Sequence, residues 1–455
     1  MLRGSVMFRT RTGWMSLLVL LVSVMLARPS SLGAQDFAGA LAEELDPAPV
    51  VAWMQLIYDR VQAERIDAPN AARLYGYAGI TAYEAMVAGA TSNRSLSGQM
   101  NGRLDIPFPE SAMDRYDWLT VENKALHTAM VELFLDSGAS RETADAFTAL
   151  FNAQLEERTA VVNDADAIAT SLAYGEIVGK EILDWARADN YLEVRQMTYE
   201  LNPDDAADWR PTTEGAQPAQ PFWGQIRPFI LPYVDECAIP LNVEYSTDPN
   251  STFYLQALEV HNIGSRLTRE QREIAEWWVD TPGITGTPAG HWVLLQNQLV
   301  DDLDLNLLQA GEMYGMMGMV LADSFIAAWS LKYQINLLRP VTYIQEHISR
   351  RWQPYIETPP FPEYPSGHSV VSGAAADMLT FLFGGVAFTD RTNVVRGLPP
   401  RSFTTFESAA YEAAISRLYG GIHFRTAIEN GLRMGECITA TALDWVVMRP
   451  FSQGE

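Results

Sequence analysis

The sequence predicts an all-α protein built from helical bundles, and three observations carry that prediction. Its 455 residues are 48% hydrophobic and 19% charged, which is enough apolar material for one large core or two smaller ones. Between residues 50 and 190, small and apolar residues recur at the three- and four-residue spacing of helices, as at Leu74, Ala78 and Ala82. Strand-like alternation and a fixed internal repeat are both scarce, which disfavours sheets and solenoids.

Residues 1–34 have the pattern of a secretory signal peptide. Three arginines precede an apolar run from Trp14 to Ala27, and small residues follow as far as Ala34. The alternative is a retained membrane anchor, but the run is shorter than the roughly 20 residues that span a bilayer. We therefore expect export to the periplasm or the medium, and a mature chain from Gln35 that has no stable membrane span.

The charge balance bears on the class of partner. The chain has 32 Lys and Arg against 56 Asp and Glu, a net charge of -24, and loss of residues 1–34 would remove four arginines and give 28 minus 56, or -28. Such an acidic chain is a poor partner for nucleic acid. Because only three residues are lysines, any anion site has to be local and made largely of arginine.

The mature chain divides by composition into three segments. Residues 35–200 read as an N-terminal helical half, residues 201–250 contain eight prolines and read as an irregular connection, and residues 251–455 read as a C-terminal helical half. Helical periodicity resumes near Thr268. The two cysteines, Cys237 and Cys437, could form one disulfide after export or remain as two buried thiols.

Two cations stand close together in AWSLKYQINLLRP. Lys332 and Arg339 are seven residues apart, so on one continuous helix they would lie about 20 degrees from eclipsed. Like charges among apolar neighbours are unfavourable unless an anion lies beside them. Pro340 disfavours helical geometry at Arg339, which places the guanidinium near a helix end. The alternative is a solvated basic edge.

A proline-rich loop runs into a helix in PFPEYPSGHSVV. Ser366 is a natural N-cap, and the free backbone N–H groups that follow it, together with the helix dipole, favour an oxyanion. Gly367 would let that oxyanion approach the backbone closely. His368 would stand beside it as an acid–base candidate, unless it is a first-turn polar residue with no role.

A glycine break separates a further cation from a histidine in ISRLYGGIHFRTA. Arg417 would end one helix and His423 would open the next, with Gly420 and Gly421 between them. The turn can bring the two side chains to one point, although six residues do not share a helical face. A lone histidine is more often a core residue than a ligand.

Together these segments resemble the signature of the vanadium haloperoxidase and type-2 phosphatidic acid phosphatase superfamily. Three separated motifs agree in residue type, order and internal spacing, which is more specific than any one of them. The resemblance covers residues 329–427 closely, and TPAGHWVLL around His291 looks like bacterial haloperoxidase-related proteins. The motifs are Lys332-x6-Arg339-Pro340, Pro365-Ser366-Gly367-His368 and Ser416-Arg417-x5-His423.

The resemblance implies a role for each motif residue. His423 would be the axial ligand of vanadate in a haloperoxidase, or the phosphorylated nucleophile in a phosphatase, and His368 would be the acid–base residue. Three cations would neutralise the oxyanion without moving, which is how preorganised sites work. The equatorial oxygens would be held by Lys332, Arg339, Arg417, Ser366 and Gly367.

Two neighbouring features bear on which activity the site has. Trp329 and Phe361 match the places where chloroperoxidases of this family carry an aromatic pair near the halide, although both could be core aromatics. The family pattern often continues His-x3-Asp, but the fourth residue after His423 is Ala427. The orienting carboxylate is missing there, which argues mildly against an efficient phosphatase.

The resemblance implies helical bundles of the vanadium haloperoxidase and acid phosphatase type, and an exported, vanadate-dependent haloperoxidase. It would oxidise halide with hydrogen peroxide to hypohalous acid, and phosphate would compete with vanadate. The alternatives are a secreted acid phosphatase acting on phosphomonoesters and a non-catalytic oxyanion-binding protein. Bundles of this kind often associate, so a homo-oligomer is compatible with the sequence.

Overall fold

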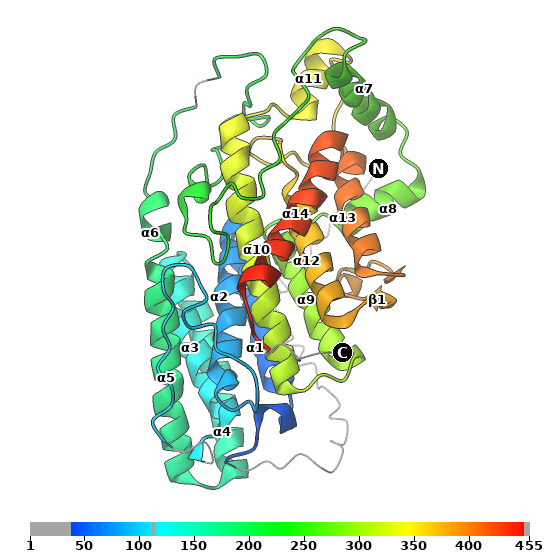
Figure 1. Cartoon of the computed structure of the whole chain (residues 1–455). Coiled ribbons are helices and arrows are strands. Elements are labelled where there is room, and N and C mark those ends of the chain that lie inside the picture. Colours follow the sequence, from blue (N-terminus) through cyan, green and yellow to red (C-terminus); the bar gives the residue numbers. More distant parts are fainter. Residues whose placement is uncertain (1–37, 112–114, 202, 450–455) are drawn as a thin grey trace, which may run out of the picture. The chain divides into compact units, whose positions relative to one another are not determined.

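Two long helices from opposite halves of the chain form the centre of the fold. This computed structural model describes residues 38–111, 115–201 and 203–449, and within them α2 (Ala68–Val87) and α10 (Leu307–Ile335) share the most extensive helix–helix contact (Figure 1). Small residues allow it, because a Cβ on Gly79 would lie 2.1 Å from the carbonyl oxygen of Tyr314. The two halves therefore share one core.

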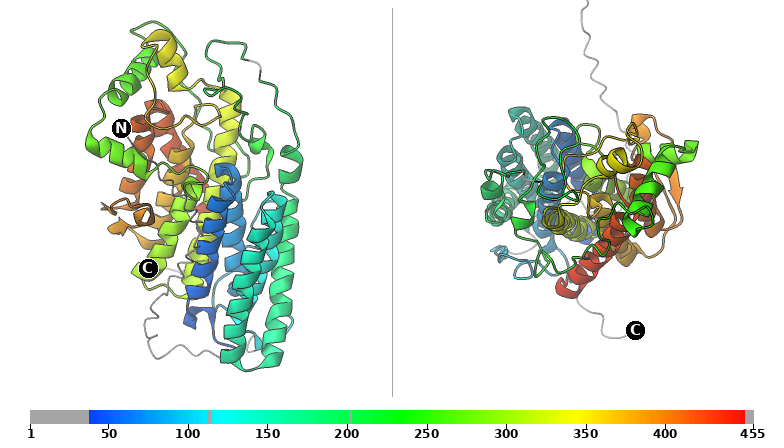
Figure 2. Two further views of the ribbon diagram at one scale, coloured as in Figure 1. Left: turned by 180° about the vertical axis from the view of Figure 1, so that it is seen from behind. Right: turned by 90° about the horizontal axis from the view of Figure 1, so that it is seen from above.

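The N-terminal helices pack outward from α2. α3 contacts both α2 and α5, and α4 packs against α3, so this side of the fold is a layered helical bundle (Figures 1 and 2). Asp67 and Asp117 cap α2 and α3 by accepting hydrogen bonds from the backbone N–H groups of Asn70 and Thr120. The other elements here are η1 (Ala42–Glu44), α1 (Ala48–Ala63), α3 (Trp118–Asp136), α4 (Arg141–Val162), α5 (Ala165–Arg187) and α6 (Tyr191–Val194).

The C-terminal helices pack on the opposite side of α10. α12 contacts α10, α13 and α14, and α14 approaches it so closely that a Cβ on Gly435 would lie 2.3 Å from the carbonyl oxygen of Val370. These elements are α7 (Thr252–Gly264), α8 (Arg269–Trp277), α9 (Thr287–Asp302), α11 (Pro340–His347), α12 (Gly367–Phe383), α13 (Phe406–Gly420) and α14 (Arg425–Trp445).

The predicted all-α class is confirmed, with two local differences. A short antiparallel hairpin joins α12 to α13 through β1 (Phe388–Asp390) and β2 (Arg401–Phe403), with η4 (Val394–Arg396) between them. Strands of three residues are too short to leave a periodic pattern. The second helical stretch also begins earlier than Thr268 suggests, because Ser251 caps α7 at Thr252.

The proline-rich connection between α6 and α7 is fixed to the core. It contains η3 (Trp223–Gln225), and three of its backbone N–H groups donate to the buried carboxylate of Asp323 on α10. Farther along, Cys237 forms a disulfide with Cys437 of α14, 200 residues away, which decides between the two alternatives that the sequence left open.

One helix in the described part of the chain, α10, is long and apolar enough to span a membrane by length and composition. Its most apolar stretch is 94% buried within the fold, as in the core helix of a globular protein. The predicted signal peptide lies outside the described residues.

Candidate oxyanion site

Helix ends bring the three sequence motifs together. Lys332 lies in the last turn of α10, Arg339 is the N-cap of α11, Ser366 is the N-cap of α12, and Arg417 lies in the last turn of α13. His423 lies in the turn between α13 and α14, so it does not open a helix as predicted. Helix ends carry free polar groups, and this arrangement gathers several of them at one place.

Lys332 and Arg339 do not share a helix, which corrects the expectation that they stack on one face. Asn336 ends α10 with a left-handed conformation, φ 53°, and the chain turns before Arg339. Both side chains are nevertheless fully buried, and the charge of Arg339 acts on Lys332. The two cations therefore come from the end of one helix and the start of the next.

The ammonium group of Lys332 fixes the loop before α12. Its Nζ donates to the carbonyl oxygens of Pro362, at 3.0 Å, of Glu363, at 2.9 Å, and of Pro365. These contacts use the three donors of an ammonium group. Burial, and then the charge of Arg339, hold the pKa of Lys332 well below its usual range. Lys332 thus holds the loop in place and adds charge to the site.

Arg339 and Arg417 are also held by backbone carbonyls. Arg339 donates to Phe361 and Ile422, and Arg417 donates through Nη2 to Trp278. Burial lowers the pKa of each guanidinium to about 10, so both remain charged at neutral pH. The Nη2 of Arg339 is buried and has no hydrogen-bond partner, which leaves a strong donor for an anion.

The start of α12 offers further donors. The hydroxyl of Ser366 caps the helix and accepts a hydrogen bond from the hydroxyl of Ser369 at 2.9 Å, which leaves its own O–H free to donate. Gly367 is the first helical residue, and the edge of Trp329 would lie 3.3 Å from a Cβ placed there. The predicted N-cap is confirmed, and the crowded position explains why glycine fits it.

His423 is oriented by a carboxylate that the sequence reasoning missed. Its Nδ1 lies 2.8 Å from Oε1 of Glu363, which also accepts from the backbone N–H of Phe424 at 2.8 Å. A carboxylate acceptor assigns the proton to Nδ1 and leaves a lone pair on Nε2, where the Nη1 of Arg339 lies 3.2 Å away. The expectation that Ala427 leaves the histidine without a carboxylate is therefore wrong.

The electrostatics keep His423 neutral. Burial, and then the charges of Arg339 and Lys332, hold the pKa of His423 well below its usual range. Burial also raises the pKa of Glu363 to about 7, against the opposing effect of Arg339. A neutral imidazole with an unprotonated Nε2 suits either ligation of a metal or nucleophilic attack.

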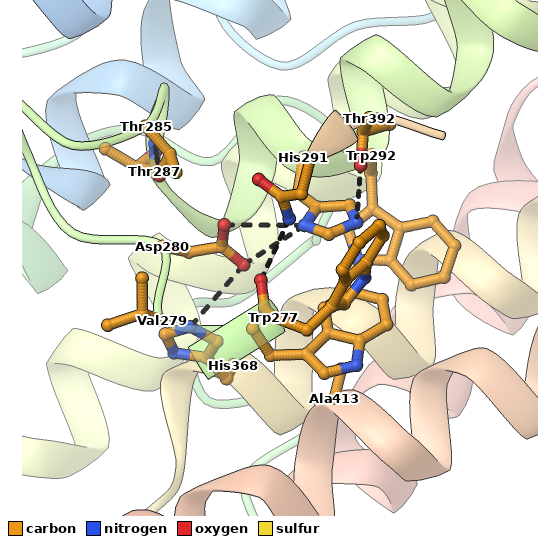
Figure 3. Close-up of polar contacts among 12 residues, drawn as sticks. Trp277, Val279, Asp280, Thr285, Thr287, His291, Trp292, His368, Thr392 and Ala413 are labelled. Atoms are coloured by element: carbon orange, nitrogen blue, oxygen red, sulfur yellow. Dashed lines mark hydrogen bonds and ion pairs between the residues drawn. The ribbon is translucent and has the colours of Figure 1, made fainter. Parts of the chain in front are cut away.

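His368 lies in the first turn of α12 with its side chain 16% exposed. Burial, and then the charge of Arg417, hold the pKa of His368 well below its usual range. Its Nε2 is without a hydrogen-bond partner, and the nearest carboxylate oxygen is Oδ2 of Asp280 at 3.9 Å (Figure 3). His368 therefore has one unpartnered ring nitrogen, and its acid–base role stays a prediction.

The predicted aromatic pair lies directly against the cations. The rings of Trp329 and Phe361 have centroids 4.8 Å apart, and the Nζ of Lys332 is 5.6 Å and 5.1 Å from them. The indole N–H of Trp329 donates to the carbonyl of Ala219 in the proline-rich connection. Both rings are therefore fixed in place beside the positively charged groups.

The chemistry of this set of side chains fits an oxyanion such as vanadate or phosphate. Three buried cations, the unpartnered Nη2 of Arg339 and the free amides at the start of α12 all favour negative charge. Within the described residues, no group of three or more His, Cys, Asp or Glu side chains is placed to hold a bare metal cation.

Comparison with known proteins agrees with the fold. Residues 312–451 match the family model described as the VCPO second helical-bundle domain. A crystal structure described as the first bacterial vanadium-dependent iodoperoxidase superposes with a TM-score of 0.83 and 32% identity, over 90% of this chain and 99% of that one. The chain therefore belongs to the vanadium haloperoxidase family.

More distant structures share the fold. A holo bacterial vanadium-dependent chloroperoxidase has a TM-score of 0.60 and 16% identity over 90% of this chain and 94% of that one. Its apo form gives the same score and identity over 88% and 94%. No curated protein matches the sequence.

Sequence reasoning missed two carboxylates, Glu363 and Asp280. Glu363 stands three residues before Ser366 in the proline-rich loop, so its sequence position indicated a place near the site but not its partner, His423. Asp280 lies between α8 and α9, 88 positions before His368, where no local pattern marks it.

Proposed function

We propose that this protein is a vanadate-dependent haloperoxidase that oxidises halide with hydrogen peroxide to hypohalous acid. The observation that carries the proposal is the neutral His423, held through Nδ1 by Glu363 and facing the cations with Nε2. Family membership at 32% identity across nearly the whole related iodoperoxidase supports it.

Each residue of the site has a distinct task in this proposal. Nε2 of His423 would ligate vanadate, while Arg339, Arg417, Ser366 and the amide of Gly367 would hold its oxygens. Lys332 adds charge and fixes the loop that carries Glu363. When bound, vanadate supplies Lewis-acid activation of hydrogen peroxide and stays in one oxidation state.

In this proposal, His368 transfers the proton that the reaction consumes. Hydrogen peroxide, halide and one proton yield hypohalous acid and water, so each turnover consumes one proton. The neutral His368, with its Nε2 unpartnered, can accept a proton from peroxide as it binds and return it to the oxygen that leaves as water.

Trp329 and Phe361 form the proposed halide wall. Their rings present an apolar surface next to the charge of Lys332, where a large, weakly hydrated anion loses little hydration. The similarity to an iodoperoxidase favours iodide as the preferred halide.

The test starts from protein purified without phosphate and loaded with orthovanadate. We expect peroxide-dependent oxidation of iodide, and bromination of a phenolic dye with bromide. Both activities should be inhibited by phosphate and abolished in His423→Ala. The matched control is His261→Ala, which removes a histidine of α7 outside the site and should retain activity.

The same preparation distinguishes the alternatives. Hydrolysis of p-nitrophenyl phosphate without halide oxidation would assign the site to a secreted acid phosphatase using His423 as nucleophile. Binding of vanadate with neither activity would assign it to an oxyanion-binding protein, and either result would overturn the proposal.

We also propose that the protein is exported. The signal-like pattern of residues 1–34 and the disulfide between Cys237 and Cys437 both support this, because such bonds persist in oxidising compartments. Expression in a bacterial host followed by mass spectrometry of the periplasmic fraction should find a chain that begins at Gln35. A full-length chain in the cytoplasm or membrane would contradict the proposal.

A further inference from the structure

A second buried histidine lies behind His368, in the α9 segment that begins at Thr287. His291 is 3% exposed, and its two ring nitrogens face two different carboxylates. Nδ1 lies 3.4 Å from its hydrogen-bond partner Oδ1 of Asp280, and Nε2 lies 2.8 Å from Oδ2 of Asp390 at the end of β1. Figure 3 shows Asp280 between His291 and His368. None of the three anion-binding motifs contains His291, Asp280 or Asp390.

The two carboxylates determine the protonation of His291. A carboxylate only accepts hydrogen bonds, so both ring nitrogens need a proton, and only the imidazolium form has two. Burial lowers the pKa of His291, but the charges of Asp280 and then Asp390 outweigh burial and raise it to about 10. The ring also stacks on Trp278, with centroids 4.2 Å apart and planes 15° from parallel, which favours a cation.

The loop that carries Asp280 is held in a strained conformation. Asp280 has φ 38°, and Thr287, a β-branched residue, has φ 71°. Left-handed backbone is unfavourable at a β-branched residue and persists only where the surroundings enforce it. Both residues lie within 11 positions of His291, so the imidazole and the strained loop are parts of one local structure.

We propose that His291 is an imidazolium clamp: held between Asp280 and Asp390, it fixes the Asp280 carboxylate beside His368 and Arg417. His291, Asp280 and Asp390 are positioning residues, because their contacts lie behind the residues that face the bound molecules. The clamp deepens the proposed function, on which its catalytic consequence rests.

The contacts of Asp280 show how the clamp reaches the site. Asp280 lies 3.9 Å from Nε2 of His368, and its charge raises the pKa of Arg417 against the effect of burial. A buried carboxylate stays in one position where opposite charges hold it. The imidazolium of His291 is a second cation beside Asp280, in addition to Arg417, so His368 and Arg417 keep an anionic partner in a fixed position.

The groups that face His291 come from every element around it. Trp277 and Trp278 come from the end of α8, Asp390 and Thr392 from β1 and the turn after it, and His368 from α12. Thr392 donates to Asp390 and has its Oγ1 3.2 Å from Nε2 of His291. It also lines a surface cavity of about 370 Å³, so the outer end of the cluster is near solvent.

The first test examines the protonation of His291 in the full protein without vanadate. The chain has six histidines, and ¹⁵N-histidine spectra report the two ring nitrogens of each. At about pH 8.5 we expect one imidazolium signal, two pH units above the usual histidine pKa. It should disappear in His291→Gln and remain in His127→Gln, which removes a histidine of α3. A neutral His291 at this pH would overturn the proposal.

The second test measures binding of orthophosphate to the same vanadate-free protein by calorimetry. His291→Gln should weaken binding roughly 10- to 100-fold, as is usual when a supporting residue is removed, and His127→Gln should not. In vanadate-loaded enzyme, His291→Gln should lower kcat/KM for peroxide and leave KM for halide unchanged. A folded variant with unchanged phosphate affinity and unchanged peroxide kinetics would exclude the positioning role.

Asp390→Asn keeps the proposal testable if His291→Gln does not fold. It removes one carboxylate, so the imidazolium should lose its proton at a pH lower by roughly one unit, and phosphate binding should weaken. An unchanged titration would contradict the clamp. Because neither the spectra nor phosphate binding needs halide oxidation, a failed haloperoxidase assay beside these results would overturn the proposed function alone.

Discussion

The carboxylate that orients His423 comes from Glu363, which is contributed by the loop before α12 and not by α14. Both oxygens of this side chain are buried, Oε1 bonds the imidazole, and Lys332 holds the carbonyl of the same residue. The orientation of the histidine therefore depends on the loop path. Glu363 therefore has two opposite effects on anion binding. Its hydrogen bond orients His423, and its negative charge repels a bound anion.

Glu363→Gln should change the relative affinity for two anions. The amide still accepts a hydrogen bond from Nδ1 but makes Nε2 less basic, so vanadate affinity should fall roughly 10- to 100-fold. Orthophosphate, bound chiefly by charge, should bind equally well or more tightly. Equilibrium titration of each anion measures the ratio, and Glu346→Gln on exposed α11 surface is the control. Equal losses of affinity for vanadate and for orthophosphate would show that Glu363 contributes only to packing.

Anion binding should take up protons. Burial and Arg339 lower the pKa of Lys332, and a bound anion would raise it again, so binding is coupled to protonation of Lys332. Affinity for sulfate, which does not titrate near neutrality, should therefore fall as pH rises. Calorimetry in buffers of different ionisation enthalpy measures the number of protons taken up for each anion bound. Release of protons when the anion binds would contradict the predicted uptake.

At the scale of elements, α10 connects the core to the site. Its centre carries Asp323, which binds the proline-rich connection, and its last turns carry Trp329 and Lys332. The same connection accepts a hydrogen bond from Trp329 at Ala219. Disturbing the Asp323 contacts should therefore affect stability first and the aromatic wall second.

Asp323→Asn should destabilise the protein by roughly 2–4 kcal/mol, because one amide oxygen cannot replace a carboxylate that accepts three buried N–H groups. Urea unfolding at neutral pH measures the change. Asp145→Asn, at an exposed position of α4, is the matched control and should change little. A loss of less than about 0.5 kcal/mol would mean that the connection is held by other contacts.

At the scale of the whole molecule, one covalent bond closes a very long loop. The disulfide joins residues 237 and 437, so it encloses α7 through most of α14 together with every residue of the candidate site. A cross-link of this length restricts the unfolded chain far more than the folded one in the chain-entropy account. The disulfide should therefore stabilise the folded protein without changing anion binding or catalysis.

Replacing both cysteines by serine should lower the free energy of unfolding by about 2–5 kcal/mol. Affinity for orthophosphate should be unchanged, because neither cysteine contacts the site residues. Thermal unfolding with and without a thiol reductant measures the effect, and the double variant should be insensitive to the reductant. Equal stability of the oxidised and reduced wild-type protein would contradict the prediction.

The sequence predicted the helical class and the three anion-binding motifs because both depend on local patterns. Helical periodicity is local, and each motif places its residues within a few turns of a helix end. The partners of the histidines were not predictable in this way, since Glu363 reaches His423 across 60 positions and Asp280 reaches His368 across 88. The prediction that Lys332 and Arg339 share one helical face was wrong, because one left-handed residue, Asn336, ends α10 between them.

The apolar character of α10 has a consequence for passage across a membrane. In the export proposed above, an unfolded chain would bring this 29-residue segment to the lipid without the core that buries it in the native state. An aspartate or lysine near the middle of a membrane helix costs about 2.5–3.5 kcal/mol. Glu312, Asp323 and Lys332 are spaced along α10 and would each oppose lateral partitioning into the bilayer. The charged residues of α10 that stabilise the folded protein would thus also disfavour insertion of this segment into the bilayer during translocation.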